Sequence, residues 1–107
     1  MAGLTKKEFK PEVIEAVWRK GKVTNLDQNT YRKDACDAMM IRKEYANLNS
    51  PYGWEIDHII PESRGGSDTL DNLQPLQWEN NRAKGDGPLC CAVTYSWNKN
   101  VRKQGTN

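Results

Sequence analysis

The 107-residue sequence contains a single histidine, His58, and no long run of apolar residues. No apolar stretch approaches the roughly 20 residues of a membrane-spanning helix, so we expect no membrane insertion. The first ten residues, MAGLTKKEFK, include no apolar stretch of signal-peptide length, and we therefore expect an intracellular protein. A content of 36% hydrophobic and 28% charged residues is typical of a globular chain.

Cysteine is also scarce, with only Cys36, Cys90 and Cys91. Three cysteines cannot all pair within one chain, and intracellular thiols are normally reduced, so we expect free thiols. The sequence has no Cys-x-x-Cys pairs, and two adjacent cysteines rarely both reach one tetrahedral ion. A structural zinc is therefore not expected, nor is a zinc-bound domain built from the cysteines and His58.

The net charge of +2 is too small to indicate a nucleic-acid binder, but the charges are unevenly distributed. Residues 1–53 contain ten Lys or Arg and seven Asp or Glu, whereas residues 54–86 contain seven acids and three bases. The final segment, SWNKNVRKQGTN, adds three bases and no acid. An acidic centre with basic flanks suits a cation site presented to a polyanion, although most surface charge only solvates a protein.

The length predicts a single domain, which we divide into a lead-in region (1–53), a central region (54–87) and a basic C-terminal tail (88–107). The segment KPEVIEAVWRKG predicts a helix, with Pro11 in its first turn and apolar residues on the one face that packs on the core. Residues 22–30 form a polar connection. Residues 31–47, YRKDACDAMMIRKEYAN, fit either a helix or a short hairpin, and their periodicity does not decide between them.

The central region is predicted to form a strand, a long loop, a second strand and a short helix. WEIDHII alternates like a strand, NLQPLQ is a plausible return strand interrupted by Pro75, and WENNRAKG is a short helix that Gly85 closes. Thirteen residues separate His58 from Asn72. A loop of that length in so small a domain more often has a function than serves only as a connection.

The segments EIDHIIP, GGSDTLDNLQPL and NNRAK resemble the HNH nuclease family, whose motif has an Asp-His pair, a Gly-Gly turn, an Asn-Leu, and a helix with His or Asn before a Lys. The close resemblance covers residues 54–86, with a looser likeness upstream. It implies an α+β fold, namely a small ββα-metal motif with an N-terminal helix packed on it. It also implies a metal-dependent endonuclease that nicks or cuts DNA.

The same resemblance implies roles for four residues. His58 is the general base, Asp57 and Asn81 are ligands of one divalent metal ion, and Asn72 steadies the loop around the base. Asn81 is chosen over Asn80 because Lys84 then stands at the expected spacing on one helix face. With Asn81 in place of the more common histidine, both ligands are hard oxygens, which favour Mg²⁺ or Mn²⁺ over zinc.

Other residues support two interpretations each. Lys84 and Arg82 either contact DNA backbone phosphates or complement the helix macrodipole. Arg64 either reaches into a groove of the DNA or is a solvated surface residue. We assign all four tryptophans to packing rather than base stacking: Trp18, Trp54, Trp78 and Trp97.

The expected partner is double-stranded DNA, with a homodimer or a specificity-giving partner left open. A non-catalytic nucleic-acid-binding module on the same scaffold is the alternative function.

Overall fold

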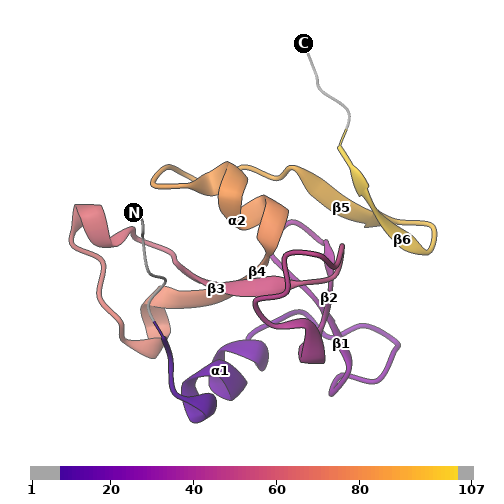
Figure 1. Cartoon of the computed structure of the whole chain (residues 1–107), viewed down its shortest axis with the longest axis horizontal. Helices are drawn as coiled ribbons and strands as arrows, with labels where there is room; N and C mark the ends of the chain where they lie inside the picture. Colours follow the sequence, from indigo (N-terminus) through magenta and orange to yellow (C-terminus); the bar gives the residue numbers. More distant parts are fainter. Residues whose placement is uncertain (1–7, 104–107) are drawn as a thin grey trace.

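A computed structural model describes residues 8–103 as a small mixed fold of two helices and three two-stranded antiparallel sheets (Figure 1). The elements are α1 (Pro11–Trp18), β1 (Tyr31–Lys33), β2 (Met39–Ile41), β3 (Trp54–His58), β4 (Leu73–Gln77), α2 (Trp78–Lys84), β5 (Val93–Ser96) and β6 (Lys99–Arg102). Three 3-10 turns join them: η1 (Arg42–Glu44), η2 (Glu62–Arg64) and η3 (Leu70–Asn72). The expected α+β class is confirmed at this level. No described helix is long and apolar enough to cross a membrane.

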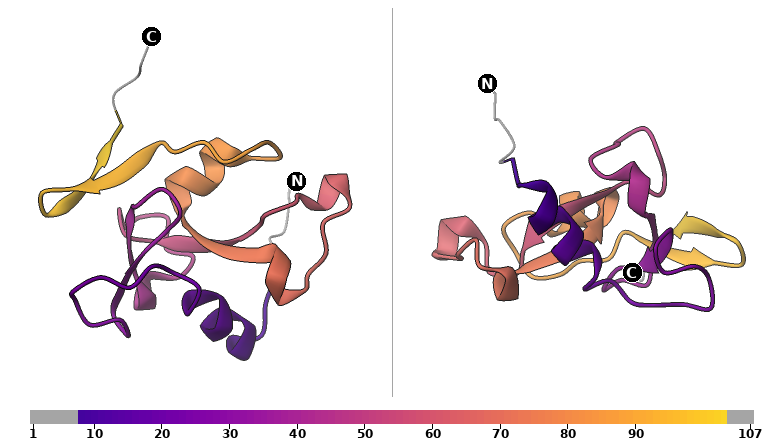
Figure 2. Two further views of the ribbon diagram at one scale, coloured as in Figure 1. Left: turned by 180° about the vertical axis from the view of Figure 1, so that it is seen from behind. Right: turned by 90° about the horizontal axis from the view of Figure 1, so that it is seen from below.

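The N-terminal helix forms where the sequence predicts it, with Pro11 at its first position. Val17 and Trp18 at its end are buried in the core with Met40, Trp54 and Leu73. The ring centroids of Trp18 and Trp54 lie 5.3 Å apart. Figures 1 and 2 show α1 on one side of the β3–β4 ribbon and α2 on the other, so the two helices hold the ribbon between them.

The segment that fitted either a helix or a hairpin is a hairpin, in which β1 pairs with β2. Asp34 directs this outcome, because its Oδ1 accepts hydrogen bonds from the backbone N–H groups of Cys36 (2.8 Å) and Ala38 (2.9 Å). Such local side-chain bonds compete with a helix and favour a turn. The other carboxylate oxygen of Asp34 accepts from Gln77 N at 2.8 Å, so the turn also fixes the start of α2.

Asp34 is buried, and this burial raises the pKa of its carboxyl above the usual value, against the lowering effect of the hydrogen bonds that it accepts. Gln77 caps α2 from within the fold, accepting from the backbone N–H groups of Glu79 and Asn80. Among the described residues, no buried side-chain nitrogen or oxygen lacks a hydrogen-bond partner.

The two expected central strands are confirmed as β3 and β4, with Asp57 opposite Gln74 and His58 opposite Leu73. Pro75 lies opposite Ile56 within the ribbon. A proline without an N–H is tolerated there because each strand of a two-stranded ribbon has one free edge. The expected short helix follows directly as α2 and contacts both strands.

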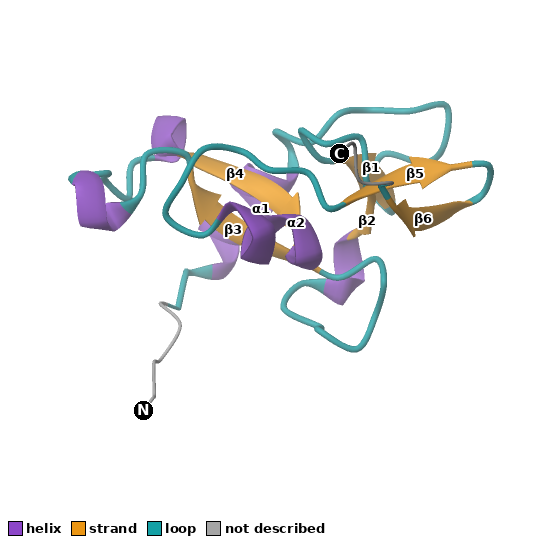
Figure 3. Ribbon diagram, turned by 90° about the horizontal axis from the view of Figure 1, so that it is seen from above, coloured by secondary structure: helices purple, strands orange, loops and turns teal. Residues whose placement is uncertain are grey.

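The C-terminal region, expected as a basic tail, includes a hairpin of β5 and β6 that the sequence did not reveal. Figure 3 shows this hairpin at the end of the molecule opposite the 59–72 loop. The assignment of Trp97 to packing is wrong, because Trp97 at the hairpin tip is 97% exposed. Trp18 and Trp54 are buried as expected, and Trp78 is half-buried.

The expectation of three free thiols is also wrong, because Cys36 and Cys91 form a disulfide and only Cys90 is free. The fold brings the two Cα atoms within 5.5 Å, although 55 positions separate them in sequence. This bridge joins the β1–β2 turn to the segment that precedes β5. The disulfide takes two of the three thiols that a cysteine-bound zinc would have used.

Candidate active site

A cavity of about 370 Å³ opens where β3 ends, between the 59–72 loop and the C-terminal end of α2. Its lining includes three of the predicted site residues, Asp57, His58 and Asn81. The remaining lining residues are Ile56, Pro61, Glu62, Ser63, Gly85 and Asp86. The fold therefore gathers a carboxylate, an imidazole and an amide from segments that are more than twenty residues apart.

Asp57 is a buried residue of the cavity lining, and two side chains contact its carboxylate. Gln74, its partner across the ribbon, donates from Nε2 to Oδ2 at 2.9 Å. The Nζ of Lys84 lies 3.3 Å from Oδ1 and donates to the carbonyl oxygen of His58 at 3.0 Å. Only 3% of the Lys84 side chain is exposed, so its ammonium is directed at Asp57 and the strand end rather than at the surface.

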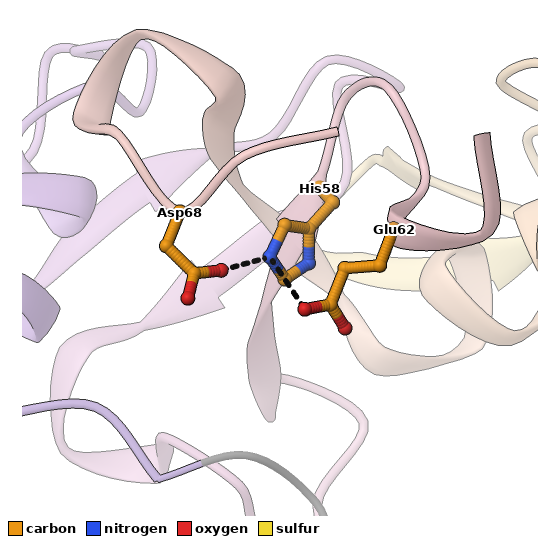
Figure 4. A group of neighbouring side chains, drawn as sticks. All are labelled: His58, Glu62 and Asp68. Atoms are coloured by element: carbon orange, nitrogen blue, oxygen red, sulfur yellow. Dashed lines mark hydrogen bonds and ion pairs between the residues drawn. The ribbon is translucent and has the colours of Figure 1, made fainter. Parts of the chain in front are cut away.

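His58 lies between two carboxylates of the loop, as Figure 4 shows. Its Nε2 is 2.7 Å from Oδ1 of Asp68 and 3.9 Å from Oε2 of Glu62. An ionised carboxylate only accepts hydrogen bonds, so the neutral ring has its proton on Nε2 and its lone pair on Nδ1. The ring of Phe9 lies 6.3 Å from the imidazole, centroid to centroid.

Asn72 does not line the cavity but ties the long loop together. Its Oδ1 accepts from Ile60 N at 2.9 Å, while its Nδ2 donates to the carbonyl oxygens of Ile60 (3.1 Å) and Ser67 (2.8 Å). A methyl group added at Gly66 would lie 1.6 Å from the Ile60 carbonyl oxygen, so only glycine fits beside this bonded network. These contacts fix the loop that directly follows His58.

The neighbouring asparagines of α2 have different surroundings. Asn80 is fully buried, and its Oδ1 accepts from the backbone N–H groups of Ala92 (2.7 Å) and Val93 (2.8 Å), which joins α2 to β5. Asn81 lines the cavity, and its Nδ2 donates to Oε1 of buried Glu55 at 2.8 Å. Because Glu55 only accepts, the amide presents its nitrogen to Glu55, which leaves the carbonyl oxygen as its ligand atom.

Two predicted DNA-contact residues lie on the surface. Arg64 ends η2 and is exposed. Arg82 is exposed on α2, with its Nη2 3.5 Å from Glu55. Neither residue lines the cavity.

Sequence reasoning missed Asp68, Glu55 and Gln74, the residues that hold the three cavity side chains. The partnership of Gln74 with Asp57 follows from strand register once the ribbon is known. Asp68 lies in an irregular loop, and a loop has no hydrophobic periodicity from which its conformation could be predicted. Its approach to His58 could not be foreseen.

The described residues also contain one group of His, Asp and Glu side chains with the spacing of metal ligands. His58, Glu62 and Asp68 have ligand atoms within 4.8 Å of one another. This group shares only His58 with the four predicted site residues, among which His58 is the base and not a ligand. Its carboxylates, Glu62 and Asp68, belong to the 59–72 loop, whereas the predicted ligands Asp57 and Asn81 belong to β3 and α2. The described residues therefore offer two separate donor sets for a cation, and His58 is a ligand in only one of them.

A family model described as HNH endonuclease matches residues 42–87. The matched segment begins at η1 and contains β3, the long loop, β4 and α2, together with every residue that lines the cavity. The resemblance to this family is confirmed over that segment. No curated protein and no solved structure matches the chain.

Proposed function

We propose that this chain is a metal-dependent endonuclease that hydrolyses the phosphodiester bonds of DNA. The observation that carries the proposal is the convergence of Asp57, His58 and Asn81 on one cavity at the end of β3. The match to the HNH endonucleases over the same segment supports the nuclease class. An intracellular location remains a prediction.

His58 is the general base of this proposal. Its Nδ1 has the free lone pair and takes a proton from the attacking water, which an imidazole does efficiently near neutral pH. The ring stays bonded through Nε2 to Asp68, so the carboxylate fixes the ring orientation and offsets the positive charge that the ring gains. Asp68 is therefore a positioning residue, and Asn72 positions the loop that holds it.

The donor set of the cavity fits one hard divalent cation, Mg²⁺ or Mn²⁺. Asp57 offers a carboxylate oxygen and Asn81 an amide oxygen, both of which these ions prefer. Lys84 and Gln74 fix the position of the Asp57 carboxylate, and Glu55 orients the Asn81 amide. When bound, such an ion neutralises charge on the phosphate and stabilises the departing oxygen.

Double-stranded DNA is the proposed substrate. The exposed Arg64 and Arg82 are assigned to contacts with backbone phosphates, whereas the burial of Lys84 assigns it to the support of Asp57. A homodimer or a partner that supplies sequence specificity remains a prediction.

A supercoiled-plasmid assay with Mg²⁺, Mn²⁺, Zn²⁺ or EDTA tests the proposal. We expect conversion to nicked or linear DNA with Mg²⁺ or Mn²⁺ and none in EDTA. Strong activity with Zn²⁺ alone would contradict the metal preference. A folded chain that binds DNA with steep salt dependence but cleaves with no metal would instead indicate the non-catalytic binding module.

Calorimetric titration of Mn²⁺ tests the ligand assignment separately. We expect Asp57→Ala and Asn81→Ala to weaken binding, with Asp71→Ala as a control, because Asp71 is an exposed acid of the 59–72 loop that does not line the cavity. Unchanged binding in both cavity variants, together with loss in Glu62→Ala, would move the ion to the His58, Glu62 and Asp68 group.

A further inference from the structure

The tip of the β5–β6 hairpin contains a tryptophan, Trp97, whose backbone conformation and solvent exposure are both unusual for this residue type. Ser96 pairs with Lys99, so Trp97 and Asn98 form a two-residue loop. Trp97 has a φ of 64°, a left-handed conformation that favours glycine at the first position of such a loop. Its side chain is also 97% exposed, which is unusual for a large aromatic group. Strained and exposed residues of this kind are found at functional surfaces.

The hairpin is also strongly basic. Residues 87–107 contain Lys99, Arg102 and Lys103 and no Asp or Glu. Arg102 lies 3.3 Å from Glu79, and the side chain of this arginine remains largely exposed. The hairpin therefore has positive charge on both of its faces, with Lys99 directly after the loop that contains the exposed Trp97 indole.

Two lysines from the first part of the chain extend this charge. The Nζ of Lys33 lies 5.2 Å from the ring centroid of Tyr95 in β5, and Lys22 forms an ion pair with Asp37 at 2.8 Å. The hydrogen bond from Lys22 lowers the pKa of Asp37, against the raising effect of desolvation, and the charges of Lys22, Lys33 and Lys103 lower it further. Lys22 also pairs with Lys33 through two backbone hydrogen bonds, so these two lysines lie side by side near Asp37. We call the whole set the hairpin surface: Lys22, Lys33, Trp97, Lys99, Arg102 and Lys103.

We infer that the hairpin surface is a nucleic-acid contact, in which its lysines and arginine bind backbone phosphates and the Trp97 indole stacks on a base. This inference rests on the proposed nuclease function for the identity of the substrate. Positive side chains interleaved with an exposed aromatic ring are the two elements with which proteins bind nucleic-acid strands. The charge of the surface selects a polyanion over an apolar protein partner.

The position of the hairpin determines what this contact does. Figures 1 and 3 show the hairpin at the end of the molecule opposite the 59–72 loop, and the longest axis measures 37 Å. A strand that advances 3.4 Å per nucleotide covers that length in about 11 nucleotides. The hairpin therefore holds the substrate at a distance from the cavity and should affect KM rather than kcat.

Binding measured in EDTA tests the inference without metal-dependent cleavage. Fluorescence anisotropy of labelled oligonucleotides of about 20 nucleotides, single-stranded and duplex, is compared for wild type and Trp97→Gly. Glycine suits the positive φ of position 97, so this variant should fold at least as well as wild type. We expect affinity to fall about tenfold, the usual effect of losing one stacked base. A larger loss on single strands identifies stacking on unpaired bases, and a larger loss on duplex identifies insertion into a groove.

The charge component has its own measurement and control. Lys99→Ala/Lys103→Ala should lower the slope of log affinity against log salt by about 1.8 on duplex DNA, because two phosphate contacts are lost. Lys43→Ala on the η1 turn, away from the hairpin, should change the slope by less than half of that amount.

Two results would overturn the inference. The first is unchanged affinity in Trp97→Gly and in the double lysine variant, with cleavage intact, which would leave the nuclease proposal standing. The second is a sedimentation measurement without DNA in which the wild type is a dimer and Trp97→Gly is a monomer. That result would assign the surface to a second copy of the chain. DNA binding that depends on the hairpin in a chain without cleavage would retain the contact and refute only the nuclease.

Discussion

Replacing Asp68 by asparagine tests the proposed control of the His58 ring. The substitution preserves size but exchanges an acceptor-only carboxylate for an amide that either donates or accepts. The charge-assisted bond to Nε2, 2.7 Å long in the structure, is lost, and with it the preference for a free lone pair on Nδ1. We therefore expect a lower kcat with little change in KM.

The size of this effect follows from the exposure of Asp68. A hydrogen bond to a charged group contributes about 1.5–3 kcal/mol when it is shielded from solvent. Since 53% of the Asp68 side chain is exposed, screening reduces this to about 1 kcal/mol. That free energy corresponds to a loss of about fivefold in kcat. A fully buried carboxylate–imidazole pair would show a far larger loss.

The tautomer can be measured directly because the chain has only one histidine. Nitrogen-15 NMR of histidine-labelled protein, without metal or DNA, should show the proton on Nε2 in wild type and a larger Nδ1–H population in Asp68→Asn. Asp71→Asn is the matched control, because Asp71 belongs to the same loop but bonds to Thr69. An unchanged tautomer together with an unchanged kcat would refute the assignment of Asp68.

Three further predictions concern the support of the site. Gly66→Ala should lower both stability and cleavage, because its methyl group would collide with the Ile60 carbonyl; a thermal melt beside the plasmid assay checks this, and wild-type values in both would contradict it. Asp34→Asn should lower the free energy of unfolding by about 2 kcal/mol, since its amide nitrogen would face two donors. Burial raises the pKa of Asp34 in the folded state, so the free energy of unfolding of wild type should fall towards that of this variant as pH rises through that pKa. A difference that grows with pH would refute the raised pKa of Asp34. Cys36→Ser should lower the unfolding free energy in urea by about 4 kcal/mol, whereas Cys90→Ser, the matched control, should not; equal effects would contradict the disulfide.

The central strands and helix could be predicted because their signals are local. The alternation in residues 54–58 and the stop at Gly85 act within a few residues of where they appear, and the structure has β3 and α2 at these places. The Asp57 and His58 pair likewise supplied the first segment of the family motif. The order of the remaining motifs then indicated the family.

The missed features depend on contacts between distant segments. The hairpin at β1 and β2 is favoured by Asp34, whose second oxygen bonds to Gln77, more than forty residues away. The Cys36 disulfide requires a Cα approach that only the whole fold provides. Trp97 violates the tendency of aromatic residues to be buried, and no neighbouring residue signals that exception.

The most direct test of the central claim is plasmid cleavage by His58→Ala with and without added imidazole, in Mg²⁺ or Mn²⁺. We expect the variant to bind DNA and metal but to cleave at least a hundredfold more slowly, about the least that a general base contributes. Imidazole, which the cavity of about 370 Å³ can admit, should restore part of the rate. Cleavage by the variant at the wild-type rate, without imidazole, would contradict the assignment of His58 as the base.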